Sequence, residues 1–383
     1  MSDANSQSSL LWASKPGIYL HIPFCRSKCF YCDFASQTNR EQDFDAYVAA
    51  VEREIACYPV LDAATLYLGG GTPSLLPPAL LDRLLRAVRS HFRLAAEAEV
   101  TMEINPGTGS EALWAVARAG GINRVSVGAQ VFDDDSLTAI GRNHTVCDVY
   151  QTVAELRAAG FDNLSLDLMF GLPDQDLAAW HSSLEQALAL APEHFSIYSL
   201  QIEERTVFGR RQALGRLTLP GQDAERDLLD LVAEVLPRAG YDRYELSSWA
   251  RPGFESVHNQ IYWLTRPYIG LGVGAHSYFE GKRYAHGPSL DAYLCMSAPA
   301  IPVEPQSPRE AMEEMLFLGL RLVRTGVSRA EFQRRFARDW SEDFGPAITK
   351  LRELNLIEET PESLRLTTRA LPLANDVFCE FLP

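Results

Sequence analysis

The chain has 383 residues, of which 46% are hydrophobic and 22% are charged, a composition typical of a globular protein with room for one large and one small domain. Its formal net charge of −15 excludes broad binding to nucleic acids or anionic membranes, because both favour basic surfaces. No run approaches the roughly 20 apolar residues that a membrane span needs.

Residues 1–15 are polar and rich in serine, which predicts a flexible leader. The segment Met1–Leu10 has neither a cationic flank nor an apolar core, so no signal peptide is indicated. Three of the seven cysteines are clustered and four are scattered, a pattern that suits the reducing cytoplasm better than a secreted, disulfide-bonded protein.

After the leader, short apolar segments alternate with amphipathic helical stretches. The strand candidates are Gly17–Phe24, Thr65–Leu68, Glu99–Ile104, Arg124–Val127, Leu164–Phe170 and Phe195–Leu200. The helix candidates are Phe44–Cys57, Pro78–His91, Ser110–Ala119, Val149–Ala159 and Ala178–Ala191. This alternation predicts an α/β fold with a parallel sheet, either a partial (β/α)6 barrel or part of a doubly wound sheet. Polar and glycine-rich residues follow almost every strand, which favours the barrel.

The last third of the chain differs from the rest in its residue composition. Residues from about Tyr241 to Tyr284 are aromatic and predict a β extension, and the proline-rich stretch 298–308 predicts a linker. Helix candidates at Arg309–Val323, Ser328–Phe336 and Pro346–Leu354 precede a hairpin candidate at Ile357–Leu366. They predict a small winged-helix-like packing or lid domain without a basic recognition helix. The predicted organisation is a leader (1–15), a barrel with its β extension (16–297), a linker (298–308) and a C-terminal domain (309–383).

The clustered cysteines Cys25, Cys29 and Cys32 have the spacing C-x3-C-x2-C directly after the first strand candidate. Three thiolates on one loop can hold three corners of a [4Fe–4S] cluster and leave the fourth iron open to a small molecule. Zinc is the main alternative, but it needs a fourth ligand, and His21 on the strand is a poor candidate. Three structural thiols are the remaining alternative. The scattered thiols are interpreted as structural or incidental: Cys57, Cys147, Cys295 and Cys379.

The cysteine loop and a glycine-rich loop carry a resemblance to a known family. Tyr-Leu-His-Ile-Pro-Phe precedes the first cysteine, and Leu68-Gly-Gly-Gly-Thr-Pro-Ser74 follows the second strand candidate. With the cysteine spacing, these motifs resemble the radical S-adenosylmethionine (SAM) enzymes over nearly the whole chain. The most similar branch holds the oxygen-independent coproporphyrinogen III dehydrogenase and the heme chaperone HemW. In this family SAM chelates the open iron, and one electron from the cluster cleaves SAM to methionine and a 5′-deoxyadenosyl radical.

The resemblance implies a SAM pocket built of carbonyls, a cation and carboxylates. Glycines at 69–71 permit close backbone approach to the amino-acid end of SAM. A carboxylate such as that of Glu103 can accept hydrogen bonds from ribose hydroxyls, and Arg142 can bind a carboxylate through two N–H groups. The positions that match SAM contacts of the family are Tyr19, Tyr31, Gly70, Gly71, Thr72, Glu103, Gln130, Arg142 and Asp167.

Two features separate the chain from the dehydrogenase. Phe34 stands where the dehydrogenase loop has a fourth cysteine. The segment His258-Asn-Gln-Ile-Tyr-Trp263 matches the HNxxYW motif of the HemW branch, and this match implies that His258 is an axial ligand of heme beside two aromatic residues. A histidine hydrogen-bonded within an aromatic β core is an equal alternative, and His276 is a second candidate ligand.

The resemblance therefore implies a cytoplasmic heme chaperone that binds a [4Fe–4S] cluster, SAM and heme. Its expected partners are an electron donor and heme-acceptor proteins, including membrane-bound respiratory enzymes, with no nucleic acid. An enzyme that decarboxylates coproporphyrinogen III by means of 5′-deoxyadenosyl radicals is the alternative, and Phe34 is the main evidence against it. Radical chemistry on an unrelated substrate is a third, weaker alternative.

Overall fold

The structure is a computed structural model that describes residues 15–295, 301–302 and 306–382. Nearly all of the predicted leader and much of the predicted linker lie outside these residues. Within the described part, twelve strands form one mixed sheet in the order β14-β13-β12-β11-β1-β3-β5-β6-β7-β8-β10-β9.

Six parallel strands form the centre of this sheet and follow one another in chain order. They are β1 (Gly17–Ile22), β3 (Thr65–Gly70), β5 (Val100–Ile104), β6 (Arg124–Gln130), β7 (Leu164–Phe170) and β8 (His194–Ser199). Beyond β1 the sheet continues with β11 (Tyr268–Leu271), β12 (His276–Phe279), β13 (Lys282–Ala285) and β14 (Ile301–Pro302). Beyond β8 it ends with β10 (Ser248–Ala250) and β9 (Asp242–Glu245).

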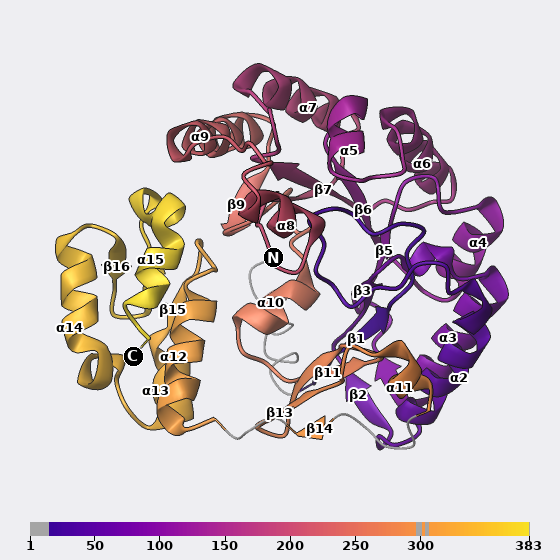
Figure 1. The fold of residues 1–383 in the computed structure, drawn as a ribbon. Helices are drawn as coiled ribbons and strands as arrows, with labels where there is room; N and C mark the ends of the chain where they lie inside the picture. The colour runs from indigo at the N-terminus through magenta and orange to yellow at the C-terminus, as the bar shows by residue number, and fades with distance from the viewer. Residues whose placement is uncertain (1–14, 296–300, 303–305, 383) are drawn as a thin grey trace.

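Helices cover the outer face of the curved sheet (Figure 1). Those that connect or follow the central strands are α2 (Phe44–Ile55), α3 (Pro78–His91), α4 (Glu111–Ala119), α5 (Asp134–Ala139), α6 (Val146–Ala158), α7 (Leu177–Ala189) and α9 (Gln222–Arg238). A further helix, α8 (Val207–Ala213), lies beside Phe30 of the cysteine loop instead. Short elements fill the connections: η1 (Glu41–Asp43), η2 (Pro73–Leu75), and the parallel pair β2 (Leu61–Ala63) and β4 (Phe92–Leu94). The alternation and the open curvature confirm the predicted partial (β/α)6 barrel.

The two faces of each central strand differ in chemistry. Outward residues such as Leu66 and Leu68 of β3 are fully buried in one apolar core with the helices. Inward residues are mainly polar, because side chains alternate between faces along a strand. By this alternation the inner face carries Tyr19, Thr65, Tyr67, Thr101, Glu103, Arg124, Ser126, Ser165, Asp167, His194, Ser196 and Tyr198. The barrel interior is therefore a polar chamber, and the apolar core surrounds it.

The aromatic region 241–284 contains a helix, α10 (Val257–Trp263), where the sequence predicted a β extension. Its first turn is capped twice. The Ser256 side chain accepts a hydrogen bond from the N–H of Asn259, and the carboxylate of Glu99 accepts from the N–H groups of Val257 and His258. Glu99 comes from a distant part of the sequence, so local sequence alone gave no signal for this cap. The prediction of β structure at the HNxxYW motif is wrong.

The C-terminal domain has its own apolar core, separate from that of the barrel. It comprises α12 (Pro308–Gly319), β15 (Val327–Ser328), α13 (Arg329–Phe336), α14 (Trp340–Glu353), β16 (Ile357–Glu359), β17 (Ser363–Leu366), η3 (Thr368–Leu373) and α15 (Ala374–Cys379). A short helix, α11 (Leu290–Leu294), precedes it. The predicted hairpin is present as β16 and β17, whereas α14 begins at Trp340, six residues before the predicted start, behind a capping box of Asp339 and Glu342.

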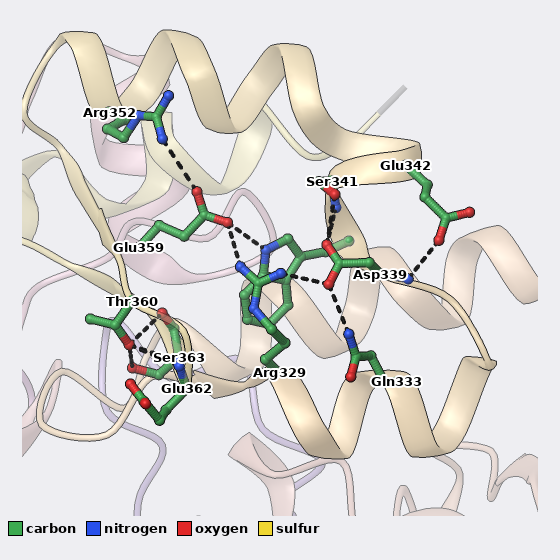
Figure 2. A network of polar contacts seen from close by, with 11 residues as sticks. Arg329, Gln333, Asp339, Ser341, Glu342, Arg352, Glu359, Thr360, Glu362 and Ser363 are labelled. Carbon is green, nitrogen blue, oxygen red and sulfur yellow. Dashed lines mark hydrogen bonds and ion pairs between the residues drawn. The ribbon is translucent and has the colours of Figure 1, made fainter.

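A half-buried ion network fixes the helices of this domain against its sheet. Arg329 lies between Asp339 and Glu359 and donates to them at 2.5 and 2.6 Å (Figure 2). The indole N–H of Trp340 also donates to Glu359, at 3.0 Å. Because one arginine joins a helix end to a strand, the network supports a rigid packing module. Among the described residues, no helix is both long enough and apolar enough to cross a membrane.

Candidate functional site

The cysteine loop leaves β1 at the carboxyl end of the central strands, which we call the mouth of the barrel. Backbone hydrogen bonds close the loop, from Cys25 N to Gln37 O at 2.9 Å, and hold its middle, from Phe30 N to Ile140 O at 3.0 Å. All three clustered cysteines are half-buried free thiols. Burial raises the pKa of Cys32 to about 11, so ionisation of this thiol needs a strong positive charge such as a metal centre.

The three thiols line one cavity of about 290 Å³, here called the mouth cavity. Of the residues predicted to bind the cluster or SAM, those in its wall are Cys25, Cys29, Cys32, Tyr31, Gly70, Gly71, Glu103, Gln130, Arg142 and Asp167. They come from the cysteine loop, from β3, β5, β6 and β7, and from the turn after α5. The fold therefore brings together residues that are far apart in the sequence.

The glycine-rich loop is needed for packing of the site itself. At Gly71 an added Cβ atom would lie 2.7 Å from the carbonyl oxygens of Ile22 and Phe24, which are backbone atoms at the start of the cysteine loop. At Gly70, where φ is +104°, a Cβ would lie 2.3 Å from the ring of His21. These glycines thus let the two loops approach each other, whatever contact they make with a ligand.

Two carboxylates face the mouth cavity from neighbouring regions of the inner wall. Glu103 accepts hydrogen bonds from the Tyr67 hydroxyl at 2.7 Å and from the Gly70 N–H at 3.0 Å. Burial raises the pKa of Glu103 to about 7 against the lowering effect of the Tyr67 bond. Asp167 accepts from the Ser126 hydroxyl at 3.0 Å, and burial also raises its pKa. Both groups can accept further hydrogen bonds from hydroxyl or ammonium groups of a ligand.

Arg142 places a positive charge in the cavity wall beside the cysteine loop. Its guanidinium donates to Asn105 Oδ1 at 2.8 Å and to the Cys29 sulfur at 3.6 Å. Its Nε is buried and has no hydrogen-bond partner within the part of the chain that the structure describes. Gln130 has a left-handed φ of +67° at the end of β6 and accepts a hydrogen bond from Tyr198 at 2.9 Å. An anchored arginine with an unused N–H suits a carboxylate ligand.

Two predicted SAM contacts, Tyr19 and Thr72, are not among the residues that line the mouth cavity. The hydroxyl of Tyr19 is 3.0 Å from Nδ1 of His21. Thr72 is buried, donates to the Cys25 sulfur at 3.6 Å and accepts from Asn105 Nδ2 at 2.8 Å. Both side chains support the cysteine loop in this structure.

His258 lies at the opposite, amino-terminal end of the barrel and is fully buried. Its Nδ1 is 2.7 Å from the Thr65 hydroxyl, and its Nε2 is 2.8 Å from the Tyr262 hydroxyl. Burial lowers its pKa to about 3, and the positive charge of Arg124 lowers it further in the same direction. Neither nitrogen of His258 is available to a metal in this conformation. The second candidate, His276, is exposed at the start of β12.

The remaining thiols and the zinc alternative can be compared with the structure. Cys57, Cys147, Cys295 and Cys379 are exposed and free. Across the described residues, no group of three or more His, Cys, Asp or Glu side chains is arranged to hold a single metal ion. Thiols that each bind a different iron of a cluster need not converge on one point. The three loop thiols are compatible with such a multi-iron cluster.

Sequence reasoning missed several residues of the cavity wall. They are Ser27, Lys28, Phe34, Ser36, Tyr67, Ile104, Asn105, Gly128, Ser196 and Tyr198. Tyr67, Ser196 and Tyr198 belong to the polar inner face, so the alternation of polar and apolar residues within each strand was a usable signal. Phe34 is 63% exposed at the rim. A second, larger cavity of about 730 Å³ adjoins Cys29 and Cys32 and is lined by Lys28, Asp33, 203–207 and Arg210.

Comparisons with known proteins agree with this geometry. The family model of the radical SAM superfamily matches residues 19–187, and that of the HemN C-terminal domain matches residues 306–373. The chain is 38% identical to the heme chaperone HemW of Lactococcus lactis over 95% of this chain and 96% of that protein. It is 37% identical to the heme chaperone HemW of Bacillus subtilis over 95% and 98% of the two chains.

A solved structure shares the whole fold. The coproporphyrinogen III oxidase HemN of Escherichia coli, described as a radical SAM enzyme, superposes with a TM-score of 0.84 over 100% of this chain and 93% of that chain. The sequence identity is 21%, so this likeness concerns the fold alone.

Proposed function

The chain belongs to the HemW family of radical SAM proteins, and we propose that it is a heme chaperone that holds a [4Fe–4S] cluster and SAM in the mouth cavity. The similarity to two proteins named heme chaperone HemW, over nearly the full length of each chain, carries this proposal. We propose that the protein acts in the cytoplasm and transfers heme to acceptor hemoproteins, including membrane-bound respiratory enzymes. An electron donor would reduce its cluster.

The residues of the mouth cavity suit both cofactors. Cys25, Cys29 and Cys32 supply three sulfur ligands on one loop, and the Arg142 guanidinium donates a hydrogen bond to the Cys29 sulfur. Once bound, such a cluster supplies an open iron and one-electron chemistry. The unused Nε of Arg142 is suited to the carboxylate of SAM, and Glu103 is suited to its ribose hydroxyls.

Heme is proposed to bind at the other end of the barrel, with His258 as an axial ligand. Ligation needs a free lone pair, and both nitrogens of His258 are engaged by Thr65 and Tyr262. Heme binding therefore requires α10 to move or His258 to change partners. This requirement suits a chaperone. An axial histidine that must first break its hydrogen bonds to the protein binds heme less tightly and therefore releases it more readily.

The test is anaerobic purification with a reconstituted cluster, followed by two assays of one sample. Heme is expected to bind near stoichiometrically, and His258→Ala is expected to abolish this binding while His276→Ala preserves it. Heme binding that survives His258→Ala but is lost in another histidine or cysteine variant contradicts the choice of ligand alone. Turnover of coproporphyrinogen III with SAM and a reductant contradicts the chaperone function.

A further inference from the structure

Tyr67 lies inside the barrel and contacts groups from both of its ends. Its hydroxyl donates to Glu103, which lines the mouth cavity, and its ring stacks on that of His258, with centroids 5.0 Å apart and planes at 29°. We propose that Tyr67 is a positioning residue through which a displacement of α10 changes the affinity of the mouth cavity for SAM. The heme-dependent part of this inference rests on the proposed function.

The contact with Glu103 gives Tyr67 its influence on the mouth cavity. Each oxygen of this carboxylate has one fixed donor, Tyr67 on Oε1 and the Gly70 N–H on Oε2. Loss of the Tyr67 donor leaves Oε1 unrestrained and makes the carboxylate easier to protonate. A carboxylate that is mobile or protonated is a poorer acceptor for the hydroxyls of a bound nucleoside.

The contact with His258 gives α10 its influence on Tyr67. His258 is completely buried between Thr65, Tyr262 and the Tyr67 ring. A movement of α10 that frees one of its nitrogens also displaces the ring on which the Tyr67 ring stacks. Because protein interiors are close-packed, the ring has to follow or leave a void, and its hydroxyl then shifts relative to Glu103.

The outer end of α10 contacts the C-terminal domain through polar and aromatic side chains. The helix contacts both β3 and α12 of the C-terminal domain (Figure 1). Arg335 of this domain donates to the Thr265 hydroxyl at 2.5 Å, and the guanidinium of Arg321 lies 4.3 Å from the centre of the Trp263 ring. Trp263 Nε1 and Arg321 Nε are buried without hydrogen-bond partners in the described chain. A polar junction that is not fully paired permits a second arrangement of α10.

Thermodynamic linkage requires heme and SAM to change each other's affinity in the same direction and by the same factor. If heme at His258 draws Tyr67 away from Glu103, heme weakens SAM binding, and SAM weakens heme binding by the same factor. Coupling energies of this kind correspond to changes of about 5- to 150-fold in affinity, and we expect about tenfold.

The experiment measures the Kd of SAM by equilibrium dialysis on the cluster-reconstituted full chain, with and without saturating heme. In the wild type, heme is expected to raise the Kd of SAM about tenfold. Tyr67→Phe is expected to bind SAM about tenfold more weakly without heme, with little further effect of heme. The matched control is Tyr293→Phe, because Tyr293 donates to the buried carboxylate of Glu54 at 2.6 Å, away from the mouth cavity. This control is expected to behave as the wild type.

A pH series separates positioning of Glu103 from general loosening of the barrel. Without the Tyr67 donor, the midpoint of SAM affinity against pH is expected to move to higher pH, whereas a merely structural defect leaves the midpoint in place. The other titratable and charged neighbours of Glu103 are unchanged in Tyr67→Phe: Tyr19, Arg124, Asp167, Tyr198 and Tyr262.

Each outcome bears on one claim. Unchanged SAM affinity in Tyr67→Phe without heme overturns the positioning role. Heme that binds stoichiometrically but leaves the Kd of SAM unchanged, or that acts equally in Tyr67→Phe, overturns the coupling while the proposed function stands. Failure of the wild type to bind heme overturns the proposed function and the coupling, and the comparison without heme still tests the role of Tyr67.

Discussion

The two ends of the barrel use polar side chains in different ways. At the mouth, three thiols and two carboxylates face a cavity, and Arg142 keeps a buried N–H without a partner in the described residues. At the amino-terminal end, His194 and His258 are completely buried, and both ring nitrogens of each lie within 2.9 Å of a hydroxyl. The mouth keeps bonding capacity for a ligand, whereas the other end uses its capacity internally.

A polar residue inside a barrel can therefore have one of two roles. A buried polar group whose bonds are complete mainly specifies the fold, while one that faces space with bonds unmade is available for chemistry. His258 belongs to the first kind in this conformation, although its motif suggests the second. Substitutions at the two ends of the barrel are therefore expected to have different effects.

Removing a cluster ligand tests the mouth most directly. Cys29→Ser is expected to abolish stable cluster assembly, since a hydroxyl replaces one of only three proposed sulfur ligands. Iron and sulfide content after anaerobic reconstitution measures the effect. Cys57→Ser changes an exposed thiol outside the loop and is expected to retain a full cluster. Equal cluster content in the two variants would remove the cysteine loop from the cofactor site.

Removing His258 tests how much its buried hydrogen bonds stabilise the amino-terminal end of the barrel. His258→Ala deletes a buried ring with two hydrogen bonds and a stacking partner, so it is expected to lower the free energy of unfolding by about 3 kcal/mol. His276→Ala, at an exposed position, is expected to change it by less than about 0.5 kcal/mol. Urea unfolding of both variants measures the difference. Similar values for the two would show that His258 is not integrated into the barrel.

A methyl group at the glycine loop tests how tightly the two mouth loops pack. Gly71→Ala places a Cβ against backbone oxygens, so it is expected to destabilise the protein by about 1–3 kcal/mol and to lower cluster content. Gly345→Ala provides the control at a position without this backbone contact. A Cβ added there would meet no atom within 4 Å outside its two chain neighbours, and the restriction that Pro346 places on the residue before it opposes the helix propensity gained, so stability is expected to change by less than about 1 kcal/mol. Thermal unfolding and iron content of the two variants measure both effects.

The sequence predicted the barrel well because its signals are local. Each central strand has apolar outer residues, and each connecting helix has an apolar face, so the βα alternation is readable without tertiary information. The cysteine spacing and the glycine loop likewise identified one wall of the mouth cavity. Most predicted cavity residues lie at or near the carboxyl end of a strand, where the topology of a parallel barrel brings them together.

What the sequence did not predict depends on distant partners. The cap on α10 comes from Glu99, more than 150 residues earlier, so the helix at the HNxxYW motif was read as β structure. The alternation along β3 marks Tyr67 as an inward-facing residue, but its importance comes from what it touches on β5 and α10, which the local sequence does not show.

The smallest expected effect concerns protons at Glu103, and its sign differs between binding and stability. Burial raises the pKa of Glu103 to about 7, so SAM affinity is expected to fall by up to about tenfold for each pH unit below 7 as the carboxylate is protonated. In the protein without SAM, the folded state binds this proton more readily than the unfolded state. Stability of the wild type relative to Glu103→Gln is therefore expected to rise as pH falls from 7 toward 4.5. Thermal unfolding of the two proteins across this range measures that difference, and a flat difference would show that Glu103 at the mouth titrates like an exposed carboxylate.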